Sequence, residues 1–263
     1  MNFVQPSIDP VIFSLFFIDI RWYSLAYIFG LVFGLLVIRY LNKVKGNLVT
    51  NGQLDSFFIW IFLGIILGGR IGYVIFYQID LFVKNPIYIF EIWNGGMSFH
   101  GGLLGVITAI YLFSRLNKIK FFYLADLVAV VAPIGLFLGR IANFINSELI
   151  GKPTEFFISV IYPTIDNLKR HPSQLYEAFF EGVILFLILL IHFYRTKHLK
   201  NFGSISGLFL IFYSLFRFLI EYLREPDTHI GLYLNFISMG QILCIPFFIF
   251  GILIVQNVKQ NKN

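Results

Sequence analysis

Residues 203–223 read GSISGLFLIFYSLFRFLIEYL, an apolar run that carries Arg217 and Glu221 near its end. A helix needs about 20 predominantly apolar residues to cross a bilayer, and this run supplies them. An ionisable residue inside such a span costs at least ~2.5–3.5 kcal/mol on insertion scales, and it indicates a functional site by default. The run therefore predicts a transmembrane helix with functional charges.

Six further apolar runs of similar length predict an all-α integral membrane protein with seven transmembrane helices. The chain has 263 residues, of which only 13% are charged, whereas a soluble domain carries about 25% charged residues. We expect one polytopic transmembrane domain over residues 1–263, because no polar stretch is long enough for a tethered soluble domain. The predicted spans are 19–41, 54–77, 97–114, 121–141, 174–194, 203–223 and 234–256.

Lysine and arginine are unevenly distributed between the two sides of these spans. Eleven lie in the loops after the first, third and fifth spans and in the C-terminal tail, and five lie on the other side. Because cytoplasmic loops carry the excess, we expect the N-terminus outside and the C-terminus in the cytoplasm. The outer loops 78–96 and 142–173 are long and partly apolar, and we expect them to lie at the membrane interface and form a cap. This topology explains the pI of 9.3 better than nucleic acid binding does.

In this topology, charged groups within the spans gather near the outer face. Arg217 and Glu221 are four residues apart, and they share a helical face with Tyr213 and Arg224. The face holds two arginines and one glutamate, so we expect an excess of positive charge that suits bidentate phosphate binding. The alternative is an ion pair that neutralises itself and helps the helix insert.

The stretch LGRIANFIN places more donors at the outer end of the fourth span. Arg140 is followed one helical turn later by Asn143, and then by Glu148 and Gly151. A guanidinium and side-chain amides together offer several N–H donors to an oxyanion. The alternative is an interfacial arginine that extends toward lipid headgroups.

Two glycine-rich stretches carry further candidates: GGRIGYVIFY contains Arg70 and GGMSFHGGLLG contains His100. Glycines permit close helix packing, and a histidine at the interface is a candidate general base, hydrogen-bond donor or structural residue. Tyr23, at the start of the first span, is by itself an ordinary interfacial aromatic. The only cysteine is Cys244 and there is no HExxH motif, so we expect no metal and no cofactor.

Seven stretches together resemble the bacterial prolipoprotein diacylglyceryl transferase family, in one order and at matching spacing over nearly the whole chain. They are DPVIFSL (9–15), GGRIGYVIFY (68–77), GGMSFHGGLLG (95–105), GRIANFIN (139–146) with ELIGK (148–152), RHPSQLYE (170–177), SGLFLIFYSLFRFLIEYLREPD (206–227) and ISMGQILCIP (237–246). The resemblance implies seven transmembrane helices with an outer cap and an outside N-terminus.

The resemblance also implies a transferase that moves the diacylglyceryl group of phosphatidylglycerol to the lipobox cysteine thiol of a pre-lipoprotein signal peptide. The implied products are a thioether and glycerol 1-phosphate, in the first step of bacterial lipoprotein maturation. The implied location is the inner membrane, among membrane lipids, with the active site toward the outer leaflet. By motif, Arg140 and Arg217 look like the arginines that handle the lipid phosphate in this family.

From the resemblance and the patterns above together, we predict two sets of site residues. The catalytic set is His100, Arg140, Arg217 and Tyr23. The substrate-binding set is Arg140, Asn143, Glu148, Gly151, Arg70, Tyr213, Arg217, Glu221 and Arg224.

Three positions depart from the family pattern: Arg21 stands where histidine is common, and Ala142 and Ser147 stand where glycine is common. Alanine at 142 is a small change that we expect to be tolerated, and we assign Arg21 no family role. Two other classes of function remain: a transporter or flippase with an anion site, and a non-enzymatic scaffold. Transporters are usually built from repeats with sites at the bilayer midplane, so the missing repeat and the one-sided charges argue against that class.

Overall fold

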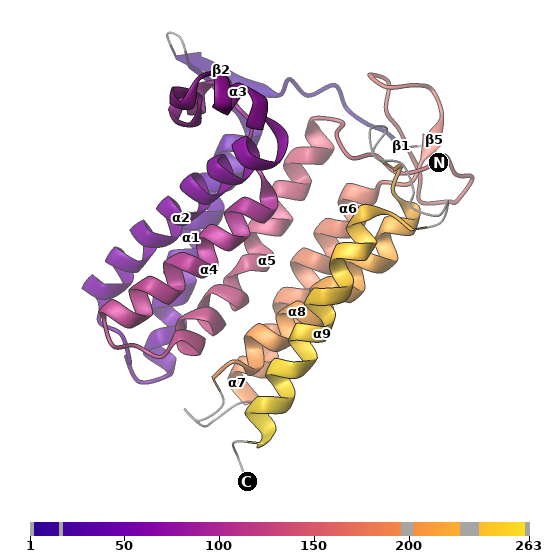
Figure 1. The fold of residues 1–263 in the computed structure, drawn as a ribbon. Helices are drawn as coiled ribbons and strands as arrows, with labels where there is room; N and C mark the ends of the chain where they lie inside the picture. The colour runs from indigo at the N-terminus through magenta and orange to yellow at the C-terminus, as the bar shows by residue number, and fades with distance from the viewer. Residues whose placement is uncertain (1–2, 16–17, 196–201, 227–236, 261–263) are drawn as a thin grey trace. The chain divides into compact units, whose positions relative to one another are not determined.

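The computed structural model describes residues 3–15, 18–195, 202–226 and 237–260. They form two compact units, one comprising Met1–Ile38 with Val128–Asn263 and the other Arg39–Leu127 (Figure 1). Helices α1 (Trp22–Val44) and α5 (Phe121–Ile145) each contribute residues to both units. The units are therefore described one at a time.

Seven helical stretches of the described residues are long and apolar enough to cross a membrane, which confirms the predicted number. They are α1, α2 (Asn51–Tyr77), α4 (Phe99–Leu116), α5, Ser173–Arg195, Ser204–Leu223 and α9 (Met239–Gln260). The first begins at Trp22 rather than at residue 19, because the residues before it are paired in a strand. The first three residues of the seventh predicted span, 234–236, lie outside the described residues.

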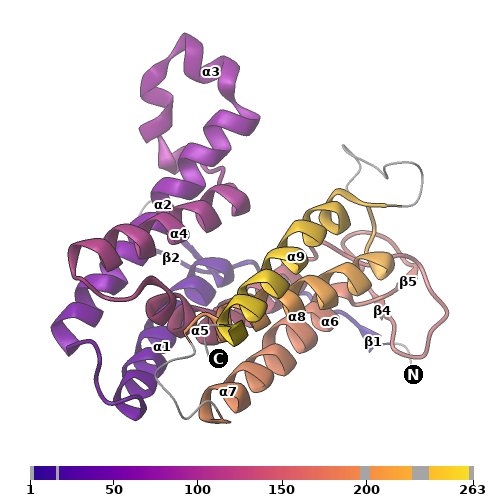
Figure 2. The ribbon, with the colours of Figure 1, turned by 60° about the horizontal axis from the view of Figure 1, so that its bottom comes forward.

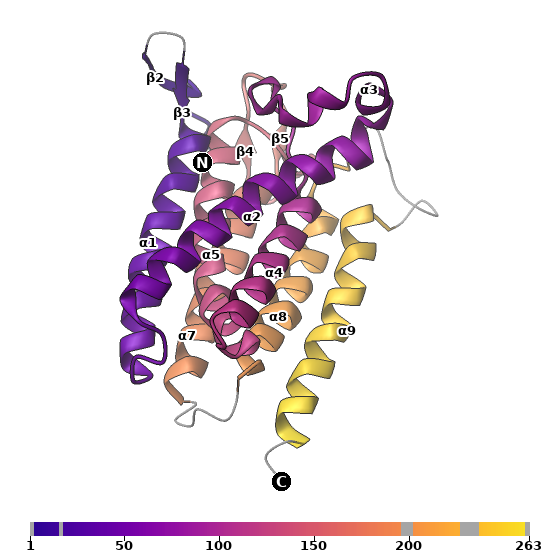
Figure 3. The same ribbon diagram turned by 60° about the vertical axis from the view of Figure 1, so that its left-hand side comes forward.

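The chain is mostly, and not entirely, helical, because five short strands of the described residues form two small sheets outside these helices. Strands β2 (Val11–Leu15) and β3 (Ile18–Arg21) form an antiparallel hairpin that stands at the start of α1 (Figure 3). Strand β1 (Phe3–Val4) pairs in parallel with β4 (Val160–Ile161), which pairs antiparallel with β5 (Lys169–Arg170). Arg21 is a strand residue in this arrangement, opposite Val11.

Two spans of the first unit are built from more than one kind of helix. The stretch Ser173–Arg195 consists of α6 (Ser173–Glu177), the π-helix η3 (Ala178–Ile184) and α7 (Leu185–Arg195). The next span is α8 (Ser204–Ile220), which a 3-10 turn, η4 (Glu221–Leu223), extends. Helices α8 and α9 lie side by side (Figure 1). Glycines allow this approach, since a Cβ at Gly207 would lie 2.9 Å from the carbonyl oxygen of Gly251.

In the second unit, α2 and α4 pack closely where they cross (Figure 3). Both helices present glycines at the contact. A Cβ built at Gly64 of α2 would lie 2.7 Å from the carbonyl oxygen of Gly105 in α4, and one at Gly105 would overlap the carbonyl of Gly64. Small residues permit such close backbone contact between membrane helices, so these glycines set the distance between the two helices.

The chain after α2 forms an arc made of α3 (Ile79–Lys84) and the 3-10 turns η1 (Pro86–Phe90) and η2 (Ile92–Asn94) (Figure 2). Buried Arg70 of α2 anchors the arc. Its guanidinium donates to the carbonyl oxygens of Tyr88 at 2.6 Å, Ile89 at 3.2 Å and Gly95 at 2.5 Å. Arg70 also lies 4.8 Å from the centre of the Tyr88 ring. The arginine therefore satisfies backbone acceptors that would otherwise be left without donors.

Replacing Gly105 with alanine should destabilise the protein by about 1–3 kcal/mol, because the new methyl group overlaps the backbone of Gly64. The matched control is Gly102→Ala on the same helix, where a Cβ meets only the carbonyl oxygen of Ile65 at 3.7 Å. The control should be neutral or more stable, since alanine favours helix by up to about 1 kcal/mol. Thermal unfolding in detergent measures both, and equal unfolding midpoints would contradict the packing argument.

Candidate functional site

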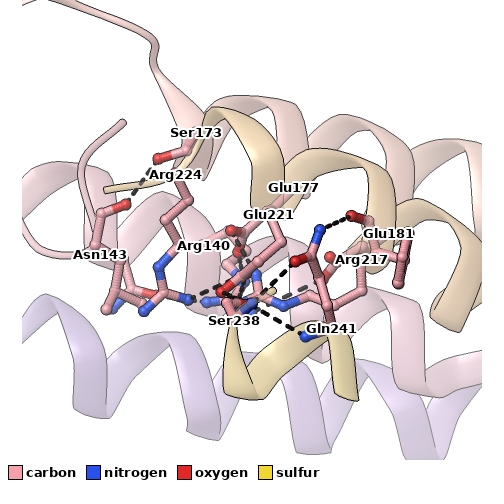
Figure 4. A network of polar contacts seen from close by, with 12 residues as sticks. Arg140, Asn143, Ser173, Glu177, Glu181, Arg217, Glu221, Arg224, Ser238 and Gln241 are labelled. Atoms are coloured by element: carbon pink, nitrogen blue, oxygen red, sulfur yellow. Dashed lines mark hydrogen bonds and ion pairs between the residues drawn. The ribbon is translucent and has the colours of Figure 1, made fainter. Parts of the chain in front are cut away.

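The first unit buries a cluster of arginine and glutamate side chains (Figure 4). Its centre is Glu177, the last residue of α6, whose side chain is 1% exposed. One carboxylate oxygen lies 2.7 Å from Nε of Arg140 and the other lies 2.5 Å from Nη1 of Arg217. Because Arg140 belongs to α5 and Arg217 to α8, a single carboxylate joins three helices.

A second carboxylate holds the other side of Arg217. Nη2 of Arg217 lies 2.7 Å from the carboxylate of Glu221, which confirms the ion pair expected from the four-residue spacing of the two residues. Ser238 donates a hydrogen bond of 3.0 Å to Glu221. Ser238 and Gln241 also exchange hydrogen bonds of 3.0 and 3.2 Å at the start of α9, in the manner of a capping box. The beginning of α9 therefore positions Glu221 beside Arg217.

The terminal nitrogens of Arg140 are held more loosely. Nη1 lies 3.5 Å from the amide oxygen of Asn143, and Nη2 lies 3.8 Å from Glu181. Asn143 in turn donates to Glu148 at 2.9 Å. The fourth-span residues that we predicted to act together are thus adjacent, and the Nη atoms of Arg140 have longer contacts than those of Arg217, which lie 2.5 and 2.7 Å from carboxylates. An incoming anion would therefore displace weaker contacts at Arg140 than at Arg217.

The charge of the cluster differs from the expectation. The sequence placed two arginines and one glutamate on the face of α8, which predicted a cationic pocket. The span Ser173–Arg195 adds two further carboxylates, those of Glu177 and Glu181. Among the described residues, three arginines therefore meet three glutamates: Arg140, Arg217 and Arg224 with Glu177, Glu181 and Glu221. The expected excess of positive charge is wrong, because the count covered the face of α8 and left out Glu177 and Glu181 at the start of the fifth span.

Glu181 is the most deeply buried of these carboxylates. It is 0% exposed, and neither of its oxygens accepts a hydrogen bond from the described residues. It lies on the π-helix η3, and π-helical turns are rare and frequently occur at functional sites. The next residue, Gly182, packs against α5, since a Cβ there would lie 2.7 Å from Cβ of Phe137. The sequence signal for this site was the pair of glutamates four residues apart at the start of the fifth span.

The loop after α5 depends on backbone contacts at Gly151. Its N–H donates to the carbonyl oxygen of His171 at 3.1 Å, and any Cβ would overlap that carbonyl. Arg170, next to His171, donates to the carbonyl oxygen of Gly151 at 3.0 Å. The same guanidinium holds the pKa of Asp166 below its usual range by hydrogen bonding. Gly151 therefore positions the loop that carries Glu148.

Ser147, one of the departures from the family pattern, has φ of +55°. Most residues avoid this left-handed conformation, which glycine adopts readily. The serine hydroxyl donates to Gln5 at 2.7 Å and accepts from Thr164 at 3.0 Å. Gln5 also donates to the carbonyl oxygen of Phe144 near the end of α5 at 2.5 Å. The side-chain hydrogen bonds offset the backbone cost of serine at this position.

Two predicted tyrosines are linked to the cluster. Tyr213, one turn before Arg217, interacts electrostatically with Glu181 and with both central arginines. Tyr23 packs against Tyr27, with ring centres 5.1 Å apart. Tyr27 interacts electrostatically with Arg140.

Two predicted residues belong to the second unit. His100 is the second residue of α4, after the N-cap Ser98, and its ring centre lies 5.5 Å from that of Phe99. Arg70 anchors the arc, as described above, and its Nε, Nη1 and Nη2 all donate to backbone carbonyls. These contacts give Arg70 a structural role within its own unit.

Known proteins resemble this chain over almost its full length. A sequence model described as prolipoprotein diacylglyceryl transferase matches residues 10–256. The phosphatidylglycerol–prolipoprotein diacylglyceryl transferase of Vibrio cholerae serotype O1 is 50% identical over 250 residues, which cover 95% of this chain and 91% of the relative. The protein of the same name from Pseudoalteromonas atlantica is 51% identical over 267 residues, and the match covers 99% of this chain and 93% of that relative. The one from Rickettsia felis is 50% identical over 249 residues, and the match covers 94% of this chain and 95% of that relative. The chain therefore belongs to the prolipoprotein diacylglyceryl transferase family.

Proposed function

We propose that this protein transfers the diacylglyceryl group of phosphatidylglycerol to the lipobox cysteine thiol of pre-lipoproteins, forming a thioether and releasing glycerol 1-phosphate. The names of its relatives support this donor and this acceptor. The observation that carries the proposal is the pair Arg140 and Arg217, with side chains only 16% and 11% exposed, held on one buried carboxylate between helices of membrane-crossing length. A lipid phosphate is the anion that such a position would meet.

In the proposed reaction the cysteine sulfur attacks C3 of the donor's glycerol, and the bond from C3 to the phosphate oxygen breaks. Negative charge grows on the departing phosphate, and guanidinium groups in a site of low polarity stabilise it. A free cysteine has a pKa near 8.5, so only a few per cent is thiolate at pH 7. A general base typically contributes about 10²–10⁴-fold. The reaction needs neither a cofactor nor an enzyme nucleophile, so buried Cys244 has no chemical role in it.

We assign the phosphate to Arg140 first and to Arg217 second. The Nη atoms of Arg140 have contacts of 3.5 and 3.8 Å, whereas those of Arg217 are bound to carboxylates at 2.5 and 2.7 Å. Arg217 must therefore exchange a carboxylate for the phosphate. Asn143 and Glu148 orient Arg140 from one side, and Glu221 orients Arg217 from the other.

The remaining predicted residues receive narrower roles. We propose His100 as the base that accepts the thiol proton. Tyr23, Tyr213 and Arg224 would border the lipid headgroup, and Gly151 would shape the loop beside it. We withdraw Arg70 as a substrate contact, because backbone carbonyls occupy its donors.

We place the enzyme in the bacterial inner membrane as one polytopic domain, with its N-terminus outside, its C-terminus in the cytoplasm and its site toward the outer leaflet. The uneven distribution of lysine and arginine between the loops supports this orientation. Three of the eleven cytoplasmic cations, Lys197, Lys200 and Lys262, lie outside the described residues. The outer loops would form a cap at the interface. Exposed Val83, Phe90 and Trp93 in the arc after α2 suit that position.

A transfer assay tests the function directly. Purified protein is incubated with phosphatidylglycerol and a synthetic lipobox peptide, and mass spectrometry follows the peptide. We expect a diacylglyceryl adduct on the cysteine with the wild-type protein and none with Arg140→Ala. Folded wild-type protein that forms no adduct with any of several phospholipids would refute the proposal, and a liposome flux assay would then test the transporter class.

Arg217→Lys should lower the transfer rate by about tenfold or more, although the charge is kept. A single ammonium group replaces two nitrogens that contact Glu177 at 2.5 Å and Glu221 at 2.7 Å. The matched control is Arg39→Lys in α1, whose partner is Asp55 and whose side chain is 39% exposed. The control should keep its activity. Wild-type rates for Arg217→Lys would rule out a geometric role for the guanidinium.

His100→Gln should lower turnover by about 10²-fold or more, while the KM for phosphatidylglycerol changes little. Glutamine keeps a polar side chain but accepts no proton at neutral pH. Steady-state kinetics at several donor concentrations separates the two parameters. An unchanged turnover number would remove His100 as the base, and a change confined to KM would make it a headgroup contact.

A further inference from the structure

The cluster around Glu177 contains as many carboxylates as guanidinium groups among the described residues. If all of them are ionised, its net charge is zero, and any further acidic group would make it negative. A phosphodiester brings one more negative charge. Adding an unbalanced charge to a buried, water-poor site is costly. Binding of an anionic donor therefore requires that the cluster lose one negative charge.

Glu181 is the carboxylate with the least support. Glu177 has cations at 2.5 and 2.7 Å, and Glu221 has one at 2.7 Å and the Ser238 hydroxyl at 3.0 Å. The nearest cation to Glu181 among the described residues is Nη2 of Arg140 at 3.8 Å, a longer distance than either ion pair of Glu177. A buried carboxylate without donors neutralises itself by taking up a proton at lower cost than one that is well paired.

The groups that face Glu181 come from every helix packed around it. Those with which it interacts electrostatically are Glu177 on α6, Arg140 on α5, Tyr213 and Arg217 on α8, Glu221 on η4 and Cys244 on α9. A phosphate that draws Arg140 toward itself removes the one ion-pair contact that Glu181 makes with the described residues. The two carboxylates nearby then disfavour its charge further.

We propose that Glu181 takes up one proton when the phosphodiester of the lipid donor binds, which releases Arg140 to the phosphate. This inference rests on the proposed function, because it needs the donor to bind at Arg140. The proton comes from water, the neutral carboxyl leaves the cluster with one positive charge, and the phosphodiester balances it. Glu181 acts through Arg140 and is thus a positioning residue. Binding that takes up one proton weakens as the pH rises, so donor affinity should fall by up to about tenfold for each pH unit.

Isothermal titration calorimetry measures the number of protons that the protein takes up when the lipid binds. Full-length protein in a nonionic detergent is titrated with dioctanoyl phosphatidylglycerol at pH 8, in buffers that differ in ionisation enthalpy. The dependence of the binding heat on the buffer gives the number of protons taken up. We expect about one proton per lipid for the wild-type protein and about none for Glu181→Gln, which carries no charge in either state. The matched control, Glu155→Gln, alters a side chain that is 86% exposed and should behave as wild type.

The outcomes separate this inference from the proposed function. Binding to wild-type protein without proton uptake would overturn the inference and leave the function intact, even if Glu181→Gln failed to fold. Uptake that persists in folded Glu181→Gln would assign the proton to another group and also overturn it. Absence of binding at every pH would instead overturn the function, and the inference with it. Thermal unfolding without lipid establishes that Glu181→Gln is folded before its titration is interpreted.

Discussion

The carboxylate of Glu177, shared between Arg140 and Arg217, is the interaction on which the first unit depends. It connects α5, α6 and α8 through contacts of 2.5 and 2.7 Å in an environment that excludes water. Removing one partner of a buried ion pair typically costs about 3–5 kcal/mol, because a charge is left without compensation. Each arginine needs the carboxylate in order to lie between the helices at all. The position of the donors that would meet a lipid phosphate is therefore a consequence of helix packing.

Other features of the unit make this packing possible. The π-helix η3 places Glu181 close to Arg140, and Gly182 lets that part of the chain approach α5. Gly240 leaves space for Glu221, since a Cβ there would lie 2.9 Å from its carboxylate. An irregular helix and two glycines thus accommodate charges that a regular, well-filled helix interface would exclude.

Signals within single helices predicted much of this arrangement. The length of the apolar runs predicted the seven membrane-length helices, and residue spacing predicted the pairing of Arg217 with Glu221 and the proximity of Arg140 to Asn143. Signals within one helix do not predict contacts between side chains on different helices. The carboxylates of the fifth span cancel the expected excess of positive charge only once three helices are packed together. The carbonyl acceptors of Arg70 lie 18 to 25 residues along the chain, in a segment with no regular helix period. Strands β1, β4 and β5 have two residues each and are too short to show an alternating pattern.

The pairing of β1 with β4 bears on how the protein is made. Phe3 lies opposite Val160, and Gln5 bonds both the end of α5 and Ser147. Residues 3–5 thus find these partners only after the chain has been synthesised as far as Ser147 and Val160. Contacts between segments so distant in sequence form late, because a long loop must close first. Assembly of the loop that carries Glu148 is therefore among the final events of biogenesis, and early insertion intermediates would hold the arginines without their finished surroundings.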